Sequence, residues 1–209
     1  MKGRNNNLHR ALKKAFIGLN ENLLKEVGEL LNFYLETKSI SYKTIKQLIP
    51  DNPIDPLLFL IEKNLFISQQ STHGTLEWGD SAFNLNPNPT FRMPSITESL
   101  LRSMQEEGFW NVDEVVKEKF RQIEDPNYQK MPRLIRQIYL SAQDQQIDGS
   151  QIRHICEKMD IEDRIDSIIS ELKGLGIMSP TISRSLFSSV RSKSPHYELN
   201  PLLFTIYRG

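Results

Sequence analysis

The sequence has little cysteine and no surplus charge. Its single cysteine, Cys156, excludes an internal disulfide and a thiolate-rich zinc site. The spacing of Cys156 from Ile152 and Ile155 predicts a small, buried apolar side chain. The 26 Lys and Arg residues balance the 26 Asp and Glu residues, so the formal net charge is zero. Any affinity for nucleic acid must therefore come from local basic patches.

Long apolar runs are also missing. The longest, residues 56–61, is far shorter than the roughly 20 residues that a membrane-spanning helix needs. The basic start at residues 1–7 leads into an amphipathic stretch and not into an apolar signal core. We therefore expect a cytoplasmic protein with no membrane partner.

The residue patterns of common catalytic and metal sites are absent from the sequence. The glycines form no phosphate-binding loop, and no serine lies in a nucleophile elbow. The four histidines, His9, His73, His154 and His196, do not have the spacing of metal ligands on a helix. We interpret His154 as an ordinary surface or boundary histidine. The sequence predicts no cofactor, no metal, no small-molecule substrate and no enzymatic activity.

An approximate internal repeat is the clearest positive feature. Residues 40–48 align with 147–155, residues 61–67 with 172–178, and residues 83–87 with 197–201. The distance between matched segments grows only from one block to the next, as expected when insertions fall in loops. The sequence therefore predicts two domains of similar architecture.

Each repeat has the pattern of three helices followed by a two-stranded hairpin. Helical periodicity predicts helices at 22–36, 41–49 and 54–64, and again at 133–145, 150–158 and 161–173. Strands are expected at 66–69 and within 76–85 around the turn at 72–75, and near 177–179 and 196–199. The predicted fold class is mainly α with small β-hairpin wings (α+β).

This order resembles the winged-helix family. The third helix of that family ends in a phrase of the Leu-Glu-Lys-Lys-Gly-Leu-Ile type, which this sequence carries at residues 61–67 and 172–178. The resemblance implies two winged-helix domains in tandem. Members of the family bind DNA, RNA or other proteins, so the fold alone does not choose a ligand.

Two segments lie outside the predicted repeats. Residues 1–20 form a basic amphipathic helix, which either packs on its neighbour or contacts phosphate or a partner. Residues 95–130 form an acidic helical connector, with possible capping boxes at Ser95–Glu98 and Asn111–Glu114. The predicted domains are 21–94 and 131–209.

The third helices lack the residues of ordinary base-reading helices. In the second domain the outward face carries Asp163, Asp166, Ser167 and Ser170, and carboxylates are repelled by DNA phosphates. In the first domain Ile54, Leu57, Leu58, Ile61 and Leu65 are expected to face inward. Phe59 and Leu60 then point away, toward a partner protein or under the N-terminal helix or connector.

The second wing has a different composition. From Lys173 to Tyr197 it contains basic residues and many serines but no acid. Such a loop can follow a phosphate backbone without reading sequence, or it is simply a solvated loop. The predicted DNA-contacting residues are Lys173, Arg184, Arg191 and Lys193, with Lys43, Lys46, Lys13 and Lys14 as a second basic patch.

These patterns favour a non-catalytic regulator or assembly factor of DNA-associated, transcription-type machinery that contacts the DNA backbone through the second wing. The alternative is an adaptor that binds proteins through Phe59, Leu60, Asp163 and Asp166, without DNA. A protein partner or a homodimer fits either hypothesis.

Overall fold

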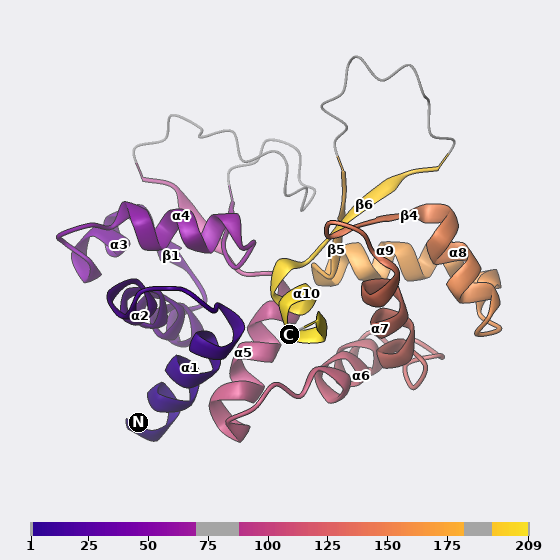
Figure 1. The fold of residues 1–209 in the computed structure, drawn as a ribbon, viewed down its shortest axis with the longest axis horizontal. Coiled ribbons are helices and arrows are strands. Elements are labelled where there is room, and N and C mark those ends of the chain that lie inside the picture. The colour runs from indigo at the N-terminus through magenta and orange to yellow at the C-terminus, as the bar shows by residue number, and fades with distance from the viewer. Residues whose placement is uncertain (1, 70–87, 182–193, 209) are drawn as a thin grey trace, which may run out of the picture. The chain divides into compact units, whose positions relative to one another are not determined.

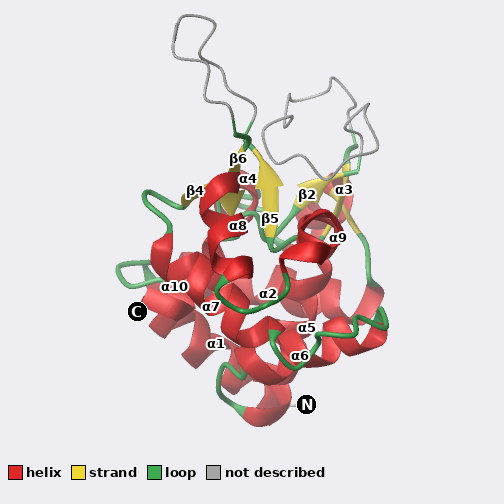
Figure 2. Ribbon diagram, turned by 90° about the vertical axis from the view of Figure 1, so that its right-hand side faces the viewer, coloured by secondary structure: helices red, strands yellow, loops and turns green. Residues whose placement is uncertain are grey.

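The computed structural model describes residues 2–69, 88–181 and 194–208 (Figure 1). The chain forms two compact units that divide between Asn111 and Val112. Most of the described residues are helical, and the short strands form three-stranded antiparallel sheets (Figure 2). The prediction of a mainly α protein with a small β component is confirmed.

Unit 1 comprises the described residues up to Asn111. Its elements are α1 (Lys2–Ala15), α2 (Glu21–Thr37), β1 (Ile40–Ser41), α3 (Tyr42–Leu48), α4 (Ile54–Glu62), β2 (Ile67–Ser68), β3 (Thr90–Arg92) and α5 (Ser95–Glu107). The strand order is β1-β3-β2. Phe91 of the central strand lies opposite Ile40 on one side and Ser68 on the other.

Unit 2 begins at Val112. Its elements are α6 (Val112–Gln122), α7 (Met131–Ser141), β4 (Gln146–Asp148), α8 (Gly149–Glu157), the 3₁₀ turn η2 (Glu162–Arg164), α9 (Ile165–Leu175), β5 (Met178–Pro180), β6 (His196–Leu199) and α10 (Pro201–Arg208). The strand order is β4-β6-β5. Tyr197 of the central strand lies opposite both Ile147 and Pro180.

The two units therefore share one order of elements, apart from the added 3₁₀ turn: helix, helix, strand, helix, helix, strand, strand, helix. The prediction of a two-stranded hairpin was incomplete, because each sheet gains a third strand, which lies just before α3 in unit 1 and just before α8 in unit 2. That strand has only two residues in β1 and three in β4. Segments this short carry no alternating pattern, so pairing with the final strand defines them.

The register corrects one part of the internal repeat. Ile40 and Ile147, which the sequence aligned, do occupy matching places in the two sheets. The central strand of unit 1 is residues 90–92, so the counterpart of Tyr197 is Phe91. The alignment of 83–87 with 197–201 was therefore wrong, and residues 83–87 and the strand predicted within 76–85 lie outside the described residues.

The segments at 1–20 and 95–130 belong to the units themselves. In unit 1, α1 packs on α2 and α5, and in unit 2, α6 and α10 pack on α7. The predicted connector is thus divided: α5 ends the first unit, and α6 begins the second. Apolar faces explain this assignment, because these side chains are buried: Ile96, Leu100, Leu101 and Met104 in α5, and Val112, Val116 and Phe120 in α6.

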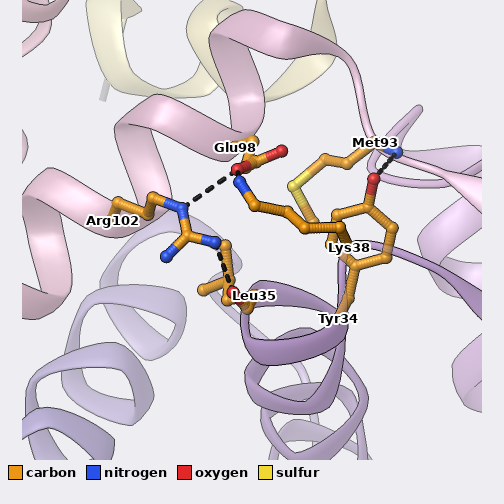
Figure 3. Close-up of polar contacts among 6 residues, drawn as sticks. All are labelled: Tyr34, Leu35, Lys38, Met93, Glu98 and Arg102. Carbon is orange, nitrogen blue, oxygen red and sulfur yellow. Dashed lines mark hydrogen bonds and ion pairs between the residues drawn. The ribbon is translucent and has the colours of Figure 1, made fainter.

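A polar cluster fastens α5 to the end of α2 (Figure 3). Glu98 accepts a hydrogen bond from Arg102 Nε at 3.0 Å and pairs with Lys38, while Arg102 Nη2 donates to the Leu35 carbonyl. Glu98 is therefore used between helices and not in the capping box predicted with Ser95. The residue before α5 is Pro94, which provides no side-chain cap. The Arg102 contact satisfies one of the carbonyls that a helix end leaves free.

A buried tyrosine joins the second helix of each unit to its sheet. The Tyr34 hydroxyl accepts a hydrogen bond from the Met93 N–H at 2.9 Å, just after β3. The Tyr139 hydroxyl donates to the Ile177 carbonyl at 2.8 Å, just before β5. That carbonyl also accepts the Asn200 N–H at 3.0 Å. Removing the Tyr34 hydroxyl therefore takes this partner from the Met93 N–H, whereas removing the Tyr139 hydroxyl leaves the Ile177 carbonyl bonded to Asn200.

We expect Tyr34→Phe to lower the free energy of unfolding by about 1–3 kcal/mol, because the buried Met93 N–H loses its partner. Tyr139→Phe should cost about 0.5–1.5 kcal/mol, since Asn200 still satisfies the Ile177 carbonyl. Urea unfolding followed by circular dichroism measures both changes. Tyr42→Phe is the control, because its hydroxyl makes no hydrogen bond within the described residues. Equal losses for Tyr34→Phe and Tyr139→Phe would contradict this account.

Candidate nucleic-acid interface

A groove on unit 2 lies between α8, α9 and the start of β6. Its volume is about 550 Å³. The residues that line it are Gly149, Ser150, Arg153, Ile165, Asp166, Ile169, Ser170, Lys173, Ser194, Pro195 and Tyr197. Ser194, at which the described chain resumes after residue 181, therefore lies at one edge of the groove.

The groove carries two cations and one acid. Arg153 comes from α8, Lys173 from the last turn of α9, and Asp166 from the first turn of α9. Neither Arg153 nor Lys173 forms an ion pair within the described residues, so both charges are available to a ligand. Three serines also line the groove, Ser150, Ser170 and Ser194, and the Ser150 hydroxyl donates to Asp148. Cations and hydroxyls together suit phosphate oxygens.

The start of α8 is held in place by its cap and by β6. Asp148 accepts the Ser150 N–H at 2.7 Å, and Gln151 accepts the Asp148 N–H at 3.1 Å, which completes a capping box. The Gly149 N–H donates to the Pro195 carbonyl at 2.8 Å. A Cβ at Gly149 would lie 3.2 Å from that carbonyl oxygen, so glycine permits the close approach. These contacts hold the start of α8, with Ser150 and Arg153, against Ser194 and Pro195.

The start of α9 is held by a partly buried ion cluster. Arg164 Nη1 donates to Asp125 at 2.8 Å, and Nη2 donates to Glu171 at 3.1 Å. The Asp125 side chain is fully buried. Burial and then the Asp125 carboxylate raise the pKa of Glu171 to about 7, against the opposite influence of Arg164. The cluster anchors α9 to the loop between α6 and α7.

The predicted faces of α9 are confirmed. The inward residues Ile161, Ile165, Ile168 and Leu172 are buried. The outward residues Asp163, Asp166, Ser167 and Ser170 are exposed. The helix itself starts at Ile165, later than predicted, because residues 162–164 form the 3₁₀ turn.

The predicted DNA-contacting residues belong to both units and to the undescribed segment 182–193. Lys173 lines the groove, whereas Arg184, Arg191 and Lys193 lie outside the described residues. In unit 1, Lys43 and Lys46 are exposed on α3, with Lys46 Nζ 5.0 Å from the Tyr42 ring centroid. Lys13 and Lys14 are exposed on α1, and Lys13 pairs with Glu21. The structure places these lysine pairs on separate helices.

The structure decides between the two alternatives for Phe59 and Leu60 on α4, a partner surface or cover within the chain. Phe59 is only 9% exposed and Leu60 is fully buried. The Phe59 ring makes an edge-to-face contact with Phe16, which follows α1, at a centroid distance of 5.1 Å. The N-terminal segment therefore covers this face, the alternative that the sequence left open. Ile54 and Leu58, expected inside, are instead 51% and 43% exposed.

Arg153 is the groove residue that sequence reasoning missed. Its signal was present, since Ile152 and Cys156 face the core and helical geometry turns Arg153 outward. Its closeness to Lys173 depends on the packing of α8 near α9, which no local pattern specifies.

Within residues 2–69, 88–181 and 194–208, no group of three His, Cys, Asp or Glu side chains could hold a metal ion. None of the helices formed by these residues is both long and apolar enough to cross a bilayer. Cys156 is buried as predicted, and burial raises the pKa of its thiol to about 11.

A protein-family model matches residues 6–208. Comparison with curated proteins gave no match, and comparison with solved structures gave none either. The match spans both units.

We expect Phe59→Ala to lower the free energy of unfolding by about 3–5 kcal/mol, because it opens a cavity beneath Phe16. A double-mutant cycle with Phe16→Ala should give a coupling of about 0.5–1.5 kcal/mol for the ring pair. Thermal and urea unfolding measure these values, and Leu58→Ala, at an exposed site, is the matched control. Additive losses from Phe16→Ala and Phe59→Ala would argue against the contact.

The Glu171 carboxyl should make stability depend on pH. Because its pKa is raised in the folded state, the protonated form is favoured by folding. Its contribution is complete below the unfolded pKa of 4.5 and is lost as pH rises through about 7. The free energy of unfolding of the wild type should fall between pH 5 and pH 8. In Glu171→Gln that fall should be smaller by on the order of 1–3 kcal/mol. Glu162→Gln, an exposed change in the same unit, should run parallel to the wild type. A parallel curve for Glu171→Gln would contradict the assignment.

Proposed function

We propose that this chain, which belongs to the protein family matched over residues 6–208, is a tandem winged-helix protein that binds duplex DNA without catalysing a reaction. The contact is with the phosphate backbone and is made by unit 2. We assign it to regulation or assembly of DNA-associated, transcription-type machinery.

The arrangement of elements supports the winged-helix proposal. In each unit the first strand, which lies before α3 or α8, pairs with the last strand, so the strand orders are β1-β3-β2 and β4-β6-β5. In unit 2, α8 and α9 then correspond to the helix-turn-helix pair. The segment between β5 and β6 corresponds to the wing.

The observation that carries the DNA proposal is that Arg153 of α8 and Lys173 of α9, which form no ion pair within the described residues, line one groove together with three serines. The groove edge at Ser194 directly follows residues 182–193, whose sequence contains Arg184, Arg191 and Lys193 and no acid. Five basic residues would thus serve one ligand. A polyanion with evenly spaced phosphates satisfies them without sequence-specific contacts.

The outward side of α9 supports backbone contact over base reading. Its exposed residues include Asp166 and Ser170, and Lys173 in the last turn is the one residue of α9 among the Arg, Lys, Asn and Gln types that recognise base edges. A carboxylate in the major groove is close to phosphates on both strands and is repelled. The helix therefore borders the site and does not read bases from it.

A protein contact through unit 1 is the second candidate. Ile54 and Leu58 are one helical turn apart on α4 and are 51% and 43% exposed, so they offer an apolar strip to another protein or to a second copy of the chain. In unit 2 the exposed Asp163 and Asp166 could meet a basic partner. This version of the adaptor hypothesis replaces Phe59 and Leu60, which are buried.

Fluorescence anisotropy of a labelled random-sequence duplex, at about 50 and 200 mM salt, tests DNA binding. The expected result for the wild type is micromolar, steeply salt-dependent binding. Arg153→Gln/Lys173→Gln should weaken it on every duplex and flatten the slope of log K against log salt by about 0.9 for each lost phosphate contact. Arg184→Gln/Arg191→Gln/Lys193→Gln should act in the same direction.

Lys117→Gln/Arg121→Gln is the matched control, because it removes two positive charges from α6 of the same unit, where both side chains already pair with glutamates. Its affinity should stay near that of the wild type. No binding at low salt would sink the DNA proposal and favour the protein contact. If the groove variant and the control variant weaken DNA binding equally, the effect of the groove substitutions comes from net charge and not from the groove.

A further inference from the structure

A second groove of unit 2 lies on the other side of α8, between α8 and α7. Its volume is about 460 Å³, within the range of small-ligand sites. The two grooves share Ser150, but Arg153 and Lys173, the cations of the proposed DNA contact, do not line this one.

The groove is formed by two facing rows of side chains. Arg133, Gln137 and Ser141 follow one another at every fourth position of α7, and Ser150, His154 and Lys158 do the same along α8 and its C-cap. The rows run in opposite directions. Lys130 Nζ donates to the Met159 carbonyl at 2.9 Å, which fastens the start of α7 to the end of α8. Arg133 is thereby placed at the same end of the groove as Lys158.

Charge is concentrated at that end. Arg133 and Lys158 form no ion pair within the described residues, and no carboxylate lines the groove. The nearest acid on the same element is Glu157, whose oxygen lies 3.5 Å from His154 Nδ1. The side chains that line the other end are uncharged: Gln137, Ser141, Ser150 and Gln151, of which the Ser150 hydroxyl donates to Asp148, a residue outside the lining. The floor includes Ile155 and Met159. The groove is thus cationic at one end and polar but uncharged at the other.

We propose that this groove binds a ligand bearing a phosphate monoester, with the phosphate between Arg133 and Lys158 and the rest of the ligand along the neutral row. Arg133 supplies a planar fork that matches two phosphate oxygens, and Lys158 supplies a second full charge.

The charge of the site favours a monoester over a carboxylate or a phosphodiester. A phosphate monoester carries between −1.5 and −2 at pH 7, by the general behaviour of such groups, and matches two fixed cations. A carboxylate or a backbone phosphodiester carries a single negative charge and would leave one cation unmatched. The small volume and the neutral end further suit a compact phosphorylated group.

The test is a ¹H–¹⁵N NMR titration of the full chain with inorganic phosphate and with phosphoserine, at ionic strength held constant with chloride. In the wild type we expect saturable shifts confined to the first turn of α7 and the last turn of α8, with millimolar Kd. Arg133→Gln/Lys158→Gln should raise that Kd at least tenfold, and its spectrum outside the groove should be unchanged, which checks its fold. Lys117→Gln/Arg121→Gln, with the same change of charge, should bind as the wild type does.

The source of the phosphate is distinguished in the same titrations. Tighter binding of phosphoserine, and tighter still of a phosphoserine peptide, supports a phosphorylated protein segment, whereas equal binding of phosphate and phosphoserine supports a small phosphorylated ligand. Shifts that do not saturate, or that spread over all exposed cations, overturn the proposal. It is also overturned if Arg133→Gln/Lys158→Gln weakens duplex binding as much as Arg153→Gln/Lys173→Gln, because the groove then belongs to a nucleic-acid surface.

Discussion

The other features depend on one constraint: in each unit the last strand pairs with the first, β3 with β1 and β6 with β4. Ile40 opposite Phe91, and Ile147 opposite Tyr197, join segments that lie about fifty residues apart in the chain. Strands of two to four residues are not stable alone, so these sheets exist because helices cover them. In unit 2 the same pairing brings Pro195 onto Gly149 and so sets the start of α8. The positions of Ser150 and Arg153 follow from it.

The two units show how one architecture supports different surfaces. Each has an added helix at both ends of its repeat, and each uses a buried tyrosine hydroxyl to join a helix to the sheet. Their outward residues differ in kind. The fourth helix of unit 1 exposes Ile54 and Leu58, whereas the equivalent α9 of unit 2 exposes Asp166 and Ser170 and carries Lys173 at its end. Buried positions hold the fold in both units, which leaves the exposed ones free to differ.

Much of the helical structure could be predicted because helical periodicity is a local property. The inward face of α9, the burial of Cys156 and the approximate ranges of the central helices all follow from which residues recur every three or four positions. The same reasoning failed on α4, where nearly every residue is apolar. With Ile54, Leu57, Leu58, Phe59 and Leu60 within about two turns, periodicity does not define a single face, and contact with Phe16 decides which residues are buried.

The sequence by itself determined the helical character of the chain, its internal duplication and the acid-free stretch from Lys173 to Tyr197, because each depends on residues near one another or on composition. Only the tertiary structure decided that α5 and α6 belong to different units, that β3 is residues 90–92, and that Arg153 lies across a groove from Lys173. These depend on long-range pairing and packing. Many arrangements satisfy the same local pattern, and the burial of apolar faces against distant segments selects one of them.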